Sequence, residues 1–245
     1  MAERKYKAVF LDWDNTIGDF THSAEHALQD LYVKYNLSRF YPSFDTYFTI
    51  YEAHNLYLWD LYGEDKISKE QLQLERFCYP LQQSEICRMG KDSLEMLARQ
   101  IGDDFCRLTT DYFSLMPYAA EVVPLLAERY PLTIISNGFI EVQYQKIDRS
   151  GLRPYFQHIV LSEEVGIQKP QPAIYEQALA LNGLHADEVV MIGDSFSSDI
   201  AGAKGVGIDQ IWIRDTDNAL PDGQSATWVV RNLQEAAEQL GICNV

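Results

Sequence analysis

The sequence predicts an α/β protein, a doubly wound, Rossmann-like parallel sheet into which a helical cap domain is inserted. Short apolar segments alternate with helical segments in the second half of the chain, which is typical of a parallel sheet with both faces covered. The first apolar segment, residues 6–12, is instead followed by about a hundred residues of helical pattern. We therefore expect a core domain of residues 1–16 and 106–245, and a cap of residues 17–105.

The expected strands of the core are short apolar runs that end at glycine or polar residues. After residues 6–12, they comprise residues 132–135, 158–161, 189–192, 210–213 and 227–230. The segments between them carry apolar residues at helical spacing, and the expected helices comprise residues 117–130, 141–150, 173–182 and 199–204. A helix between successive strands favours parallel pairing, because parallel strands need a crossover connection.

The inserted segment has the start and stop signals of several helices. Apolar residues recur at helical spacing from Thr21, and a second helix is expected to begin after Ser43 as its N-cap and to end at Gly63. Ser68 is the expected N-cap of a third helix, and the helical pattern returns over residues 91–113. We therefore expect an all-helical cap.

The balance of charges limits the classes of partner. The 245 residues include 36 acidic and 20 basic ones, a net charge of −16, whereas nucleic acid polymers and anionic membranes attract basic surfaces. No apolar run approaches the ~18–20 residues of a membrane span, and the start lacks the apolar region of a signal peptide. We expect a cytoplasmic protein without nucleic acid or membrane partners. The cysteines, which lack C-x-x-C spacing and are expected to be free thiols, are Cys78, Cys87, Cys106 and Cys243.

Polar residues follow three of the expected strands. Asp12 and Asp14 end the first strand, Ser136 ends the second, and Asp194 lies just beyond the strand over residues 189–192. Ligands bind beyond the carboxyl ends of the strands in open α/β sheets, so we expect these side chains to share one crevice. Residues two apart on a strand face the same way, and two acids so close repel each other unless a cation or a shared proton intervenes. The pattern therefore favours a binding site over a polar loop.

The side-chain types at these strand ends favour a magnesium ion and a phosphate. Carboxylates such as Asp12 and Asp194 are the hard oxygen ligands that suit Mg²⁺, and no histidine or cysteine lies near these strand ends to suit zinc or copper. Positive charge from Mg²⁺ and a lysine would recruit an anion into an otherwise acidic protein. The candidate phosphate-binding residues are Ser136, Asn137 and Lys169.

Four motifs in order along the chain resemble those of the haloacid dehalogenase-like (HAD) phosphohydrolases. They are Asp12-x-Asp14-x-Thr16, Ser136-Asn137-Gly138, Lys169-Pro170, and Gly193-Asp194-Ser195 with Asp199. The insertion between the first two motifs is similar to a C1-type cap. The resemblance implies an HAD-like core, Mg²⁺ as cofactor, and hydrolysis of phosphoric monoesters through an aspartyl-phosphate. Dehalogenation is disfavoured, because dehalogenases of this superfamily lack the second acid of the first motif.

The resemblance also implies a role for each motif residue. Asp12 is the nucleophile, and Asp14 is the acid that protonates the leaving oxygen and then the base that activates water. Asp12, the backbone carbonyl of Asp14, and Asp194 hold the metal, while Ser136 and Lys169 hold the phosphate. The supporting residues are Thr16, which steadies Asp14, and Asp199, which orients Lys169.

Further segments are similar to the YjjG-type pyrimidine 5′-nucleotidase family, notably residues 58–77 and 149–156. This resemblance implies a small phosphorylated metabolite as the partner, with a pyrimidine nucleoside 5′-monophosphate favoured. The N-acylneuraminate-9-phosphatases share several of these features, so a phosphatase for that or another sugar phosphate, or a phosphomutase of the same fold, stays an alternative. A catalytically silent binding domain is disfavoured by the intact motifs. The sequence leaves open whether the protein is a monomer or a dimer.

Overall fold

The computed structural model describes residues 5–214, 216, 218–220 and 222–242, which divide into two compact units. The sheet unit comprises Met1–Asp19 and Ser114–Val245, and the helical unit comprises Phe20–Phe113. The expected boundary between residues 105 and 106 falls inside helix α4, Lys91–Asp111. The buried side chains of this helix continue to Thr110, so the chain leaves the helical unit only after the whole helix has packed.

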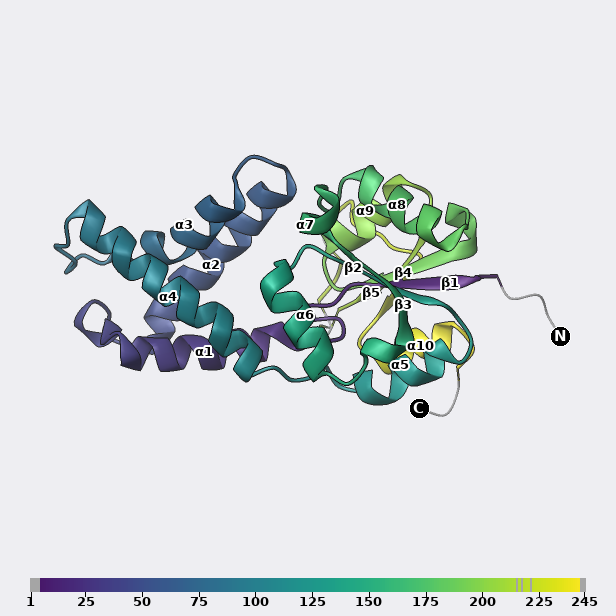
Figure 1. Cartoon of the computed structure of the whole chain (residues 1–245), viewed down its shortest axis with the longest axis horizontal. Coiled ribbons are helices and arrows are strands. Elements are labelled where there is room, and N and C mark those ends of the chain that lie inside the picture. Colours follow the sequence, from purple (N-terminus) through teal and green to yellow (C-terminus); the bar gives the residue numbers. More distant parts are fainter. Residues whose placement is uncertain (1–4, 215, 217, 221, 243–245) are drawn as a thin grey trace. The chain divides into compact units, whose positions relative to one another are not determined.

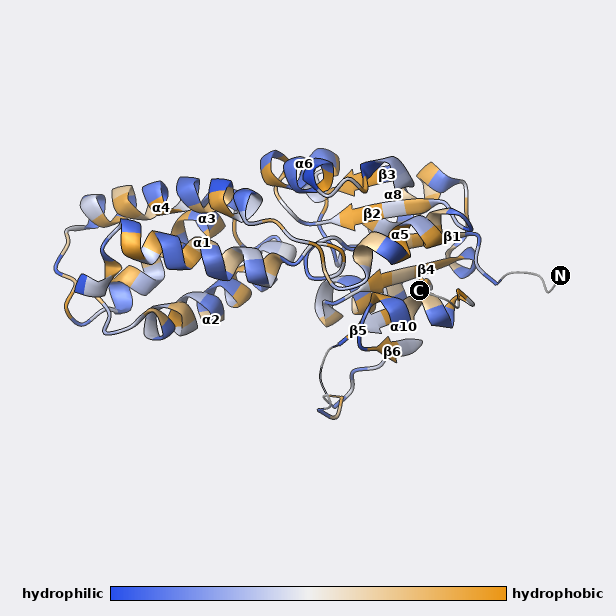
Figure 2. Ribbon diagram, turned by 90° about the horizontal axis from the view of Figure 1, so that it is seen from below, coloured by the Kyte–Doolittle hydropathy of each residue, from blue (hydrophilic) through white to orange (hydrophobic). Residues whose placement is uncertain are grey.

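The sheet unit contains six strands in the order β3-β2-β1-β4-β5-β6, and all the neighbouring pairs are parallel. The first strand of the chain therefore lies at the centre of the sheet, between β2 and β4. Figure 2 shows these strands as predominantly hydrophobic, which is typical of a sheet buried on both faces. The strands are β1 (Ala8–Leu11), β2 (Leu132–Ser136), β3 (Phe156–Leu161), β4 (Val189–Gly193), β5 (Asp209–Ile213) and β6 (Trp228–Val230).

Helices cover both faces of this sheet (Figure 1). Helices α5 (Ala119–Ala127) and α10 (Leu233–Gln239) lie on one face, and α8 (Pro172–Asn182) and α9 (Gly202–Gly205) lie on the other. The doubly wound sheet expected from the sequence is thus confirmed. The segments that follow carboxyl ends of strands are α6 (Ile140–Arg149), α7 (Ser162–Val165) and the π-helix η4 (Phe196–Ala201), and the 3₁₀ turns of the unit are η2 (Arg153–Tyr155) and η3 (Ala186–Glu188).

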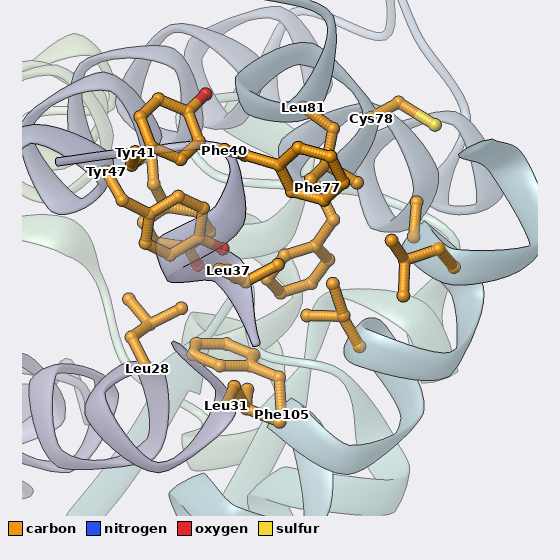
Figure 3. Packing of buried hydrophobic residues seen from close by; sticks show 14 of the residues in the cluster. Leu28, Leu31, Leu37, Phe40, Tyr41, Tyr47, Phe77, Cys78, Leu81 and Phe105 are labelled. Carbon is orange, nitrogen blue, oxygen red and sulfur yellow. The ribbon is translucent and has the colours of Figure 1, made fainter. Parts of the chain in front are cut away.

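The helical unit consists of helices with an interior of their own. Aromatic and aliphatic side chains share this interior, where Phe77 meets Phe105 edge-on at 5.4 Å between ring centroids (Figure 3). Phe77 also stacks on Tyr51 at 5.4 Å between ring centroids. Each helix contributes buried residues to one cluster, so this unit does not depend on the sheet for a core. Its segments are α1 (Phe20–Lys34), η1 (Leu37–Arg39), α2 (Phe44–Gly63), α3 (Lys69–Gln83) and α4.

The expected helix starts of the inserted segment are confirmed. The Ser43 hydroxyl accepts a hydrogen bond from the backbone N–H of Thr46, and Ser68 forms a capping box with Gln71 at the start of α3. The segment expected to be one helix over residues 199–204 is instead the end of the π-helix η4 followed by the start of α9. A π-turn widens the backbone by one residue per hydrogen bond and often marks a functional site.

The described part of the chain also tests the expectations about membrane spans and cysteines. None of its helices combines the length and apolar character needed to cross a lipid bilayer. Cys78, Cys87 and Cys106 are free thiols, while Cys243 lies outside the described residues.

Candidate active site

The central strand β1 ends in a tight loop that carries the two acids of the first motif. Asp12 continues the sheet, since its backbone N–H donates to the carbonyl of Ile192, and its side chain is 10% exposed. Trp13 points into the core and meets the Phe156 ring edge-on. The chain then turns at Asn15, whose φ of 60° lies in the left-handed region that asparagine tolerates better than most residues. This turn brings Gly18 back beside Asp14, with which it forms an isolated β-bridge.

A buried lysine ties the nucleophile candidate to a second acid. The ammonium of Lys169 lies 2.5 Å from a carboxylate oxygen of Asp12 and 2.7 Å from one of Asp199. Lys169 is 2% exposed and Asp199 is fully buried, so each charge depends on the others for stabilisation. Asp199, which the resemblance implies as the residue that orients Lys169, forms an ion pair with it.

The segment after β4 packs its acids closely. Asp199 lies against Gly193, where a Cβ atom would come 2.4 Å from a carboxylate oxygen of Asp199. Only glycine therefore fits at this strand end. The backbone N–H of Ser195 donates to the same carboxylate at 3.0 Å, and the carbonyl of Asp194 accepts from the indole of Trp212 at 2.8 Å. These contacts fix the backbone from which the Asp194 side chain projects.

These acids perturb one another's protonation. Burial raises the pKa of Asp12 to about 7; Lys169 lowers that pKa, and Asp199 and Asp14 raise it. Burial also raises the pKa of Asp194, with Asp12 and Asp199 adding to the effect. Burial disfavours the charged form of Lys169, but Asp12 and Asp199 outweigh it and raise the lysine's pKa. The cluster thus holds more negative charge than one lysine balances.

The donor set at this edge fits a hard divalent cation. One carboxylate oxygen from each of Asp12, Asp194 and Asp199 lies within 4.8 Å of the others. Carboxylates without histidine or thiolate neighbours suit Mg²⁺, and a cation would relieve the repulsion that raises the pKa values of Asp12 and Asp194. Geometry therefore brings Asp199 into the acidic cluster beside the two side chains predicted as ligands.

Ser136 and Asn137 of the second motif make different kinds of contact. The hydroxyl of Ser136, 1% exposed at the end of β2, accepts a hydrogen bond from the backbone N–H of Gly138. Asn137 is predicted to bind phosphate, but its side-chain amide forms two reciprocal hydrogen bonds with the backbone of Lys169, at 2.8 and 2.9 Å. The amide holds the Lys169 segment because it matches both the N–H and the C=O of that backbone.

Three residues at the site escape the motif analysis. Gln143 and Lys146, both on α6, contact the carboxylate of Asp14 at 3.1 and 2.8 Å respectively. The hydroxyl of Tyr175 donates to the carbonyl of Ser198, and its ring packs in the core below Lys169 and Asp199. The Thr16 hydroxyl, expected to steady Asp14, has no hydrogen bond with any residue that the structure describes.

A sequence signal for the two α6 residues exists, although it is weak. Gln143 and Lys146 are three apart, so they share one face of a helix, and that face also contains the apolar Val142 and Ile147. Polar side chains on an apolar helix face are unusual unless they have partners. Which partners they have depends on tertiary contacts that spacing alone does not give.

Comparison with known sequences agrees with this geometry. The family model described as haloacid dehalogenase-like hydrolase matches residues 6–207. Pyrimidine 5′-nucleotidase YjjG of Escherichia coli (strain K12) is 29% identical over 237 residues, which cover 96% of this chain and 98% of that protein. Pyrimidine 5′-nucleotidase PynA of Streptococcus pneumoniae is also 29% identical, over 84% of this chain and 83% of that protein.

Solved structures give the same result for the fold. A magnesium-bound crystal structure of the HAD-hydrolase YfnB from Bacillus subtilis superimposes with a TM-score of 0.84 at 26% identity, covering 97% of this chain and 100% of the other. A 2-haloacid dehalogenase from Pseudomonas syringae, at 24% identity and a TM-score of 0.64, shares the fold. From the family match over most of its length, we conclude that the chain belongs to the haloacid dehalogenase-like hydrolases.

Proposed function

We propose that this hydrolase is a Mg²⁺-dependent phosphatase that cleaves a small phosphomonoester through an aspartyl-phosphate. The observation that carries the proposal is the ion-paired set of Asp12, Lys169 and Asp199 beside Asp194, in a site bounded by the Ser136 hydroxyl. Phosphoryl transfer requires positioning and neutralisation of charge more than covalent chemistry from the protein. This set of side chains offers both.

In the first step a carboxylate oxygen of Asp12 forms a bond to phosphorus, and the bond from phosphorus to the leaving oxygen breaks. Asp14 gives that oxygen a proton, so the product leaves as an alcohol. Lys169 and Ser136 bind oxygens of the phosphoryl group. Mg²⁺, held by Asp12, Asp194 and the Asp14 backbone carbonyl, would supply positive charge against the phosphoryl oxygens.

In the second step Asp14 takes a proton from a water molecule, which attacks phosphorus and releases phosphate from Asp12. The same carboxyl group therefore serves as acid and then as base, so no further titrating group is needed. Asp12 must be ionised to act as nucleophile. The Lys169 ammonium lowers the pKa of Asp12 against the effect of burial, which favours that ionised form.

A pyrimidine nucleoside 5′-monophosphate is the substrate we propose. The support is the likeness to two pyrimidine 5′-nucleotidases over most of the chain. A sugar or triose phosphate is the competing class, because a glyceraldehyde 3-phosphate phosphatase of Pyrococcus abyssi is 38% identical over 42% of this chain. That likeness spans less than half of the chain, so it carries less weight for the substrate.

A screen of phosphate release tests both parts of the proposal. The purified protein is assayed with Mg²⁺, and again with EDTA, on p-nitrophenyl phosphate, nucleoside 5′-monophosphates, hexose phosphates, glyceraldehyde 3-phosphate and N-acylneuraminate 9-phosphate. We expect Mg²⁺-dependent turnover with the highest kcat/KM on pyrimidine nucleotides. Equal kcat/KM on sugar phosphates would overturn the nucleotide assignment alone. Absence of turnover on every ester would overturn the phosphatase itself.

A further inference from the structure

Helix α6 contacts the proposed proton-transfer residue with two buried donors. The Lys146 ammonium lies 2.8 Å from Oδ1 of Asp14, and the Gln143 amide lies 3.1 Å from Oδ2. Gln143 is fully buried and Lys146 is 4% exposed, whereas the Asp14 side chain is 28% exposed. Each oxygen of the carboxylate is thus held from the protein side, while part of the group stays open to a substrate.

The amide of Gln143 also connects Asp14 to the phosphate end of the site. Its Nε2 donates to the Ser136 hydroxyl at 2.8 Å as well as to Asp14. The amide nitrogen faces Asp14, so Gln143 acts as a donor to an oxygen of the Asp14 carboxylate. One side chain therefore sets the spacing between a proposed phosphate ligand and the proposed proton shuttle.

The position of α6 is itself fixed within the sheet unit. The backbone N–H of Ile140, at the start of the helix, donates to the Glu163 carboxylate at 2.7 Å, and the Tyr144 hydroxyl donates to Glu164 at 2.9 Å. At Gly138 an added Cβ would lie 2.6 Å from Cδ of Gln143. The hydrogen bond at the helix start fixes α6, and the lack of a Cβ atom at Gly138 leaves room for Gln143 beside Ser136 and Asp14.

We propose that Gln143 and Lys146 are positioning residues that fix the Asp14 carboxyl group, which carries the proton in the acid step, for proton transfer to the leaving oxygen. This inference rests on the phosphatase function proposed above. A carboxylate free to turn about its two side-chain torsions would seldom face the leaving oxygen, and alignment of this kind accounts for a large share of catalysis. Binding of the phosphate itself does not require the pair, since Lys169 and Mg²⁺ carry the charge that attracts it.

The dependence of kcat/KM on the leaving group distinguishes the positioning of Asp14 from other roles of the pair. p-Nitrophenolate leaves without a proton, whereas the more basic phenolate of phenyl phosphate needs one from Asp14. The parameter kcat/KM reports steps up to formation of the aspartyl-phosphate, so it contains the acid step and omits the attack of water. Loss of Gln143 or Lys146 should therefore lower kcat/KM for phenyl phosphate much more than for p-nitrophenyl phosphate.

The test compares kcat/KM for these two esters in Lys146→Met, Gln143→Met and the wild type. We expect a fall of about tenfold or more with phenyl phosphate, a fraction of the ~10²–10⁴ that a general acid contributes, and a small change with p-nitrophenyl phosphate. The inhibition constant of inorganic phosphate should stay unchanged. Lys146→Arg, which keeps a charged donor, should recover most of the loss, and Gly138→Ala should reproduce the loss by displacing Gln143.

Two matched controls lie away from Asp14. Gln145→Met changes an exposed amide of the same helix that bonds to the Glu141 carbonyl, and Lys204→Met changes an exposed lysine that bonds to Ser225. Both should match the wild type on both esters. Equal slowing of the two esters in Lys146→Met, or no slowing of either, would overturn the positioning role while leaving the phosphatase intact. A wild type inactive on both esters and on every ester of the screen above would overturn the proposed function and this inference together.

Discussion

The two units of the chain bury charged side chains in different surroundings. In the sheet unit an aliphatic interior ends in a charged cluster, where Lys169 is 2% exposed and is paired with Asp12 and Asp199. In the helical unit the buried Arg76 lies over aromatic faces, with its guanidinium 5.1 Å from the Phe77 centroid and 4.9 Å from that of Phe105. Lys169 is paired with carboxylates, whereas the partners of Arg76 include two aromatic rings.

This difference suggests that substitutions in the two units affect different properties, the reaction in one and the stability of the fold in the other. The groups able to form or break bonds in the proposed reaction belong to the sheet unit, and the dense ring packing belongs to the helical unit. Substitutions at the strand ends should therefore change turnover more than folding. Substitutions in the aromatic cluster should change folding first. The experiments below would sharpen that division or break it.

The largest effect is expected from Asp12→Asn. Loss of the nucleophile should reduce kcat on p-nitrophenyl phosphate by at least about 10⁴-fold, because residues that form a covalent intermediate leave only residual binding effects when removed. Steady-state assays with Mg²⁺ measure this change, and circular dichroism checks the fold. The control is Asp45→Asn, an exposed acid in the first turn of α2. Substantial metal-dependent turnover by Asp12→Asn would contradict its assignment as nucleophile.

The aromatic cluster gives the next effect. Phe77→Ala removes a fully buried ring that contacts Tyr51 and Phe105, and should lower the free energy of unfolding by about 3–5 kcal/mol. Urea unfolding measures it, with Met96→Ala, 58% exposed on α4, as a control within ~0.5 kcal/mol of the wild type. A loss below 1 kcal/mol would mean that the helical unit gains its stability elsewhere than from this cluster.

Metal binding should stabilise the protein through the acidic cluster. A ligand present at about 100 times its dissociation constant adds ~2.7 kcal/mol to the free energy of unfolding, so saturating Mg²⁺ should raise the Tm. Asp194→Asn removes one carboxylate of the cluster and should abolish most of that rise. Thermal scans with Mg²⁺ and with EDTA compare the two proteins. An equal Mg²⁺ response in both would place the cation elsewhere.

The smallest effect concerns an ion pair on the helical unit. The Lys34 ammonium, with Tyr35 and Arg107, lowers the pKa of Asp104 below its usual 3.8. A lowered pKa stabilises the folded state above the unfolded value, and that contribution disappears as the pH falls through the folded value. Lys34→Met should therefore cost less than ~1 kcal/mol near neutral pH, and the difference should shrink below pH 4. Urea unfolding at several pH values measures it; a difference that grows in acid would contradict the assignment.

The sequence predicts the features that depend on local pattern. Buried strands are continuous apolar runs, and polar side chains at their carboxyl ends must share one edge of a parallel sheet, so Asp12, Ser136 and Asp194 could be placed together without coordinates. Helix starts at Ser43 and Ser68 were equally accessible, because capping depends on residues within one turn.

Other features depend on packing between distant segments. Lys146 is separated from Asp14 by more than half the chain, and its place on an apolar helix face does not identify Asp14 as its partner. Asn137 lies in a recognised motif, yet its amide is used by the Lys169 backbone, which only the folded loop reveals. The π-helix before Gly202 could not be predicted from the spacing of apolar residues either, because one wider turn leaves that spacing almost unchanged.

The two connections between the units have a consequence for how the fold tolerates change. The outgoing and returning segments are paired, since Gly18 bridges Leu115 and the N–H of Asp19 donates to the carbonyl of Ser114. The ends of the insertion are therefore already closed. The entropy of closing a loop grows only with the logarithm of its length, so doubling the insertion would cost ~0.6 kcal/mol. Insertions of very different sizes can thus occupy this point without destabilising the sheet.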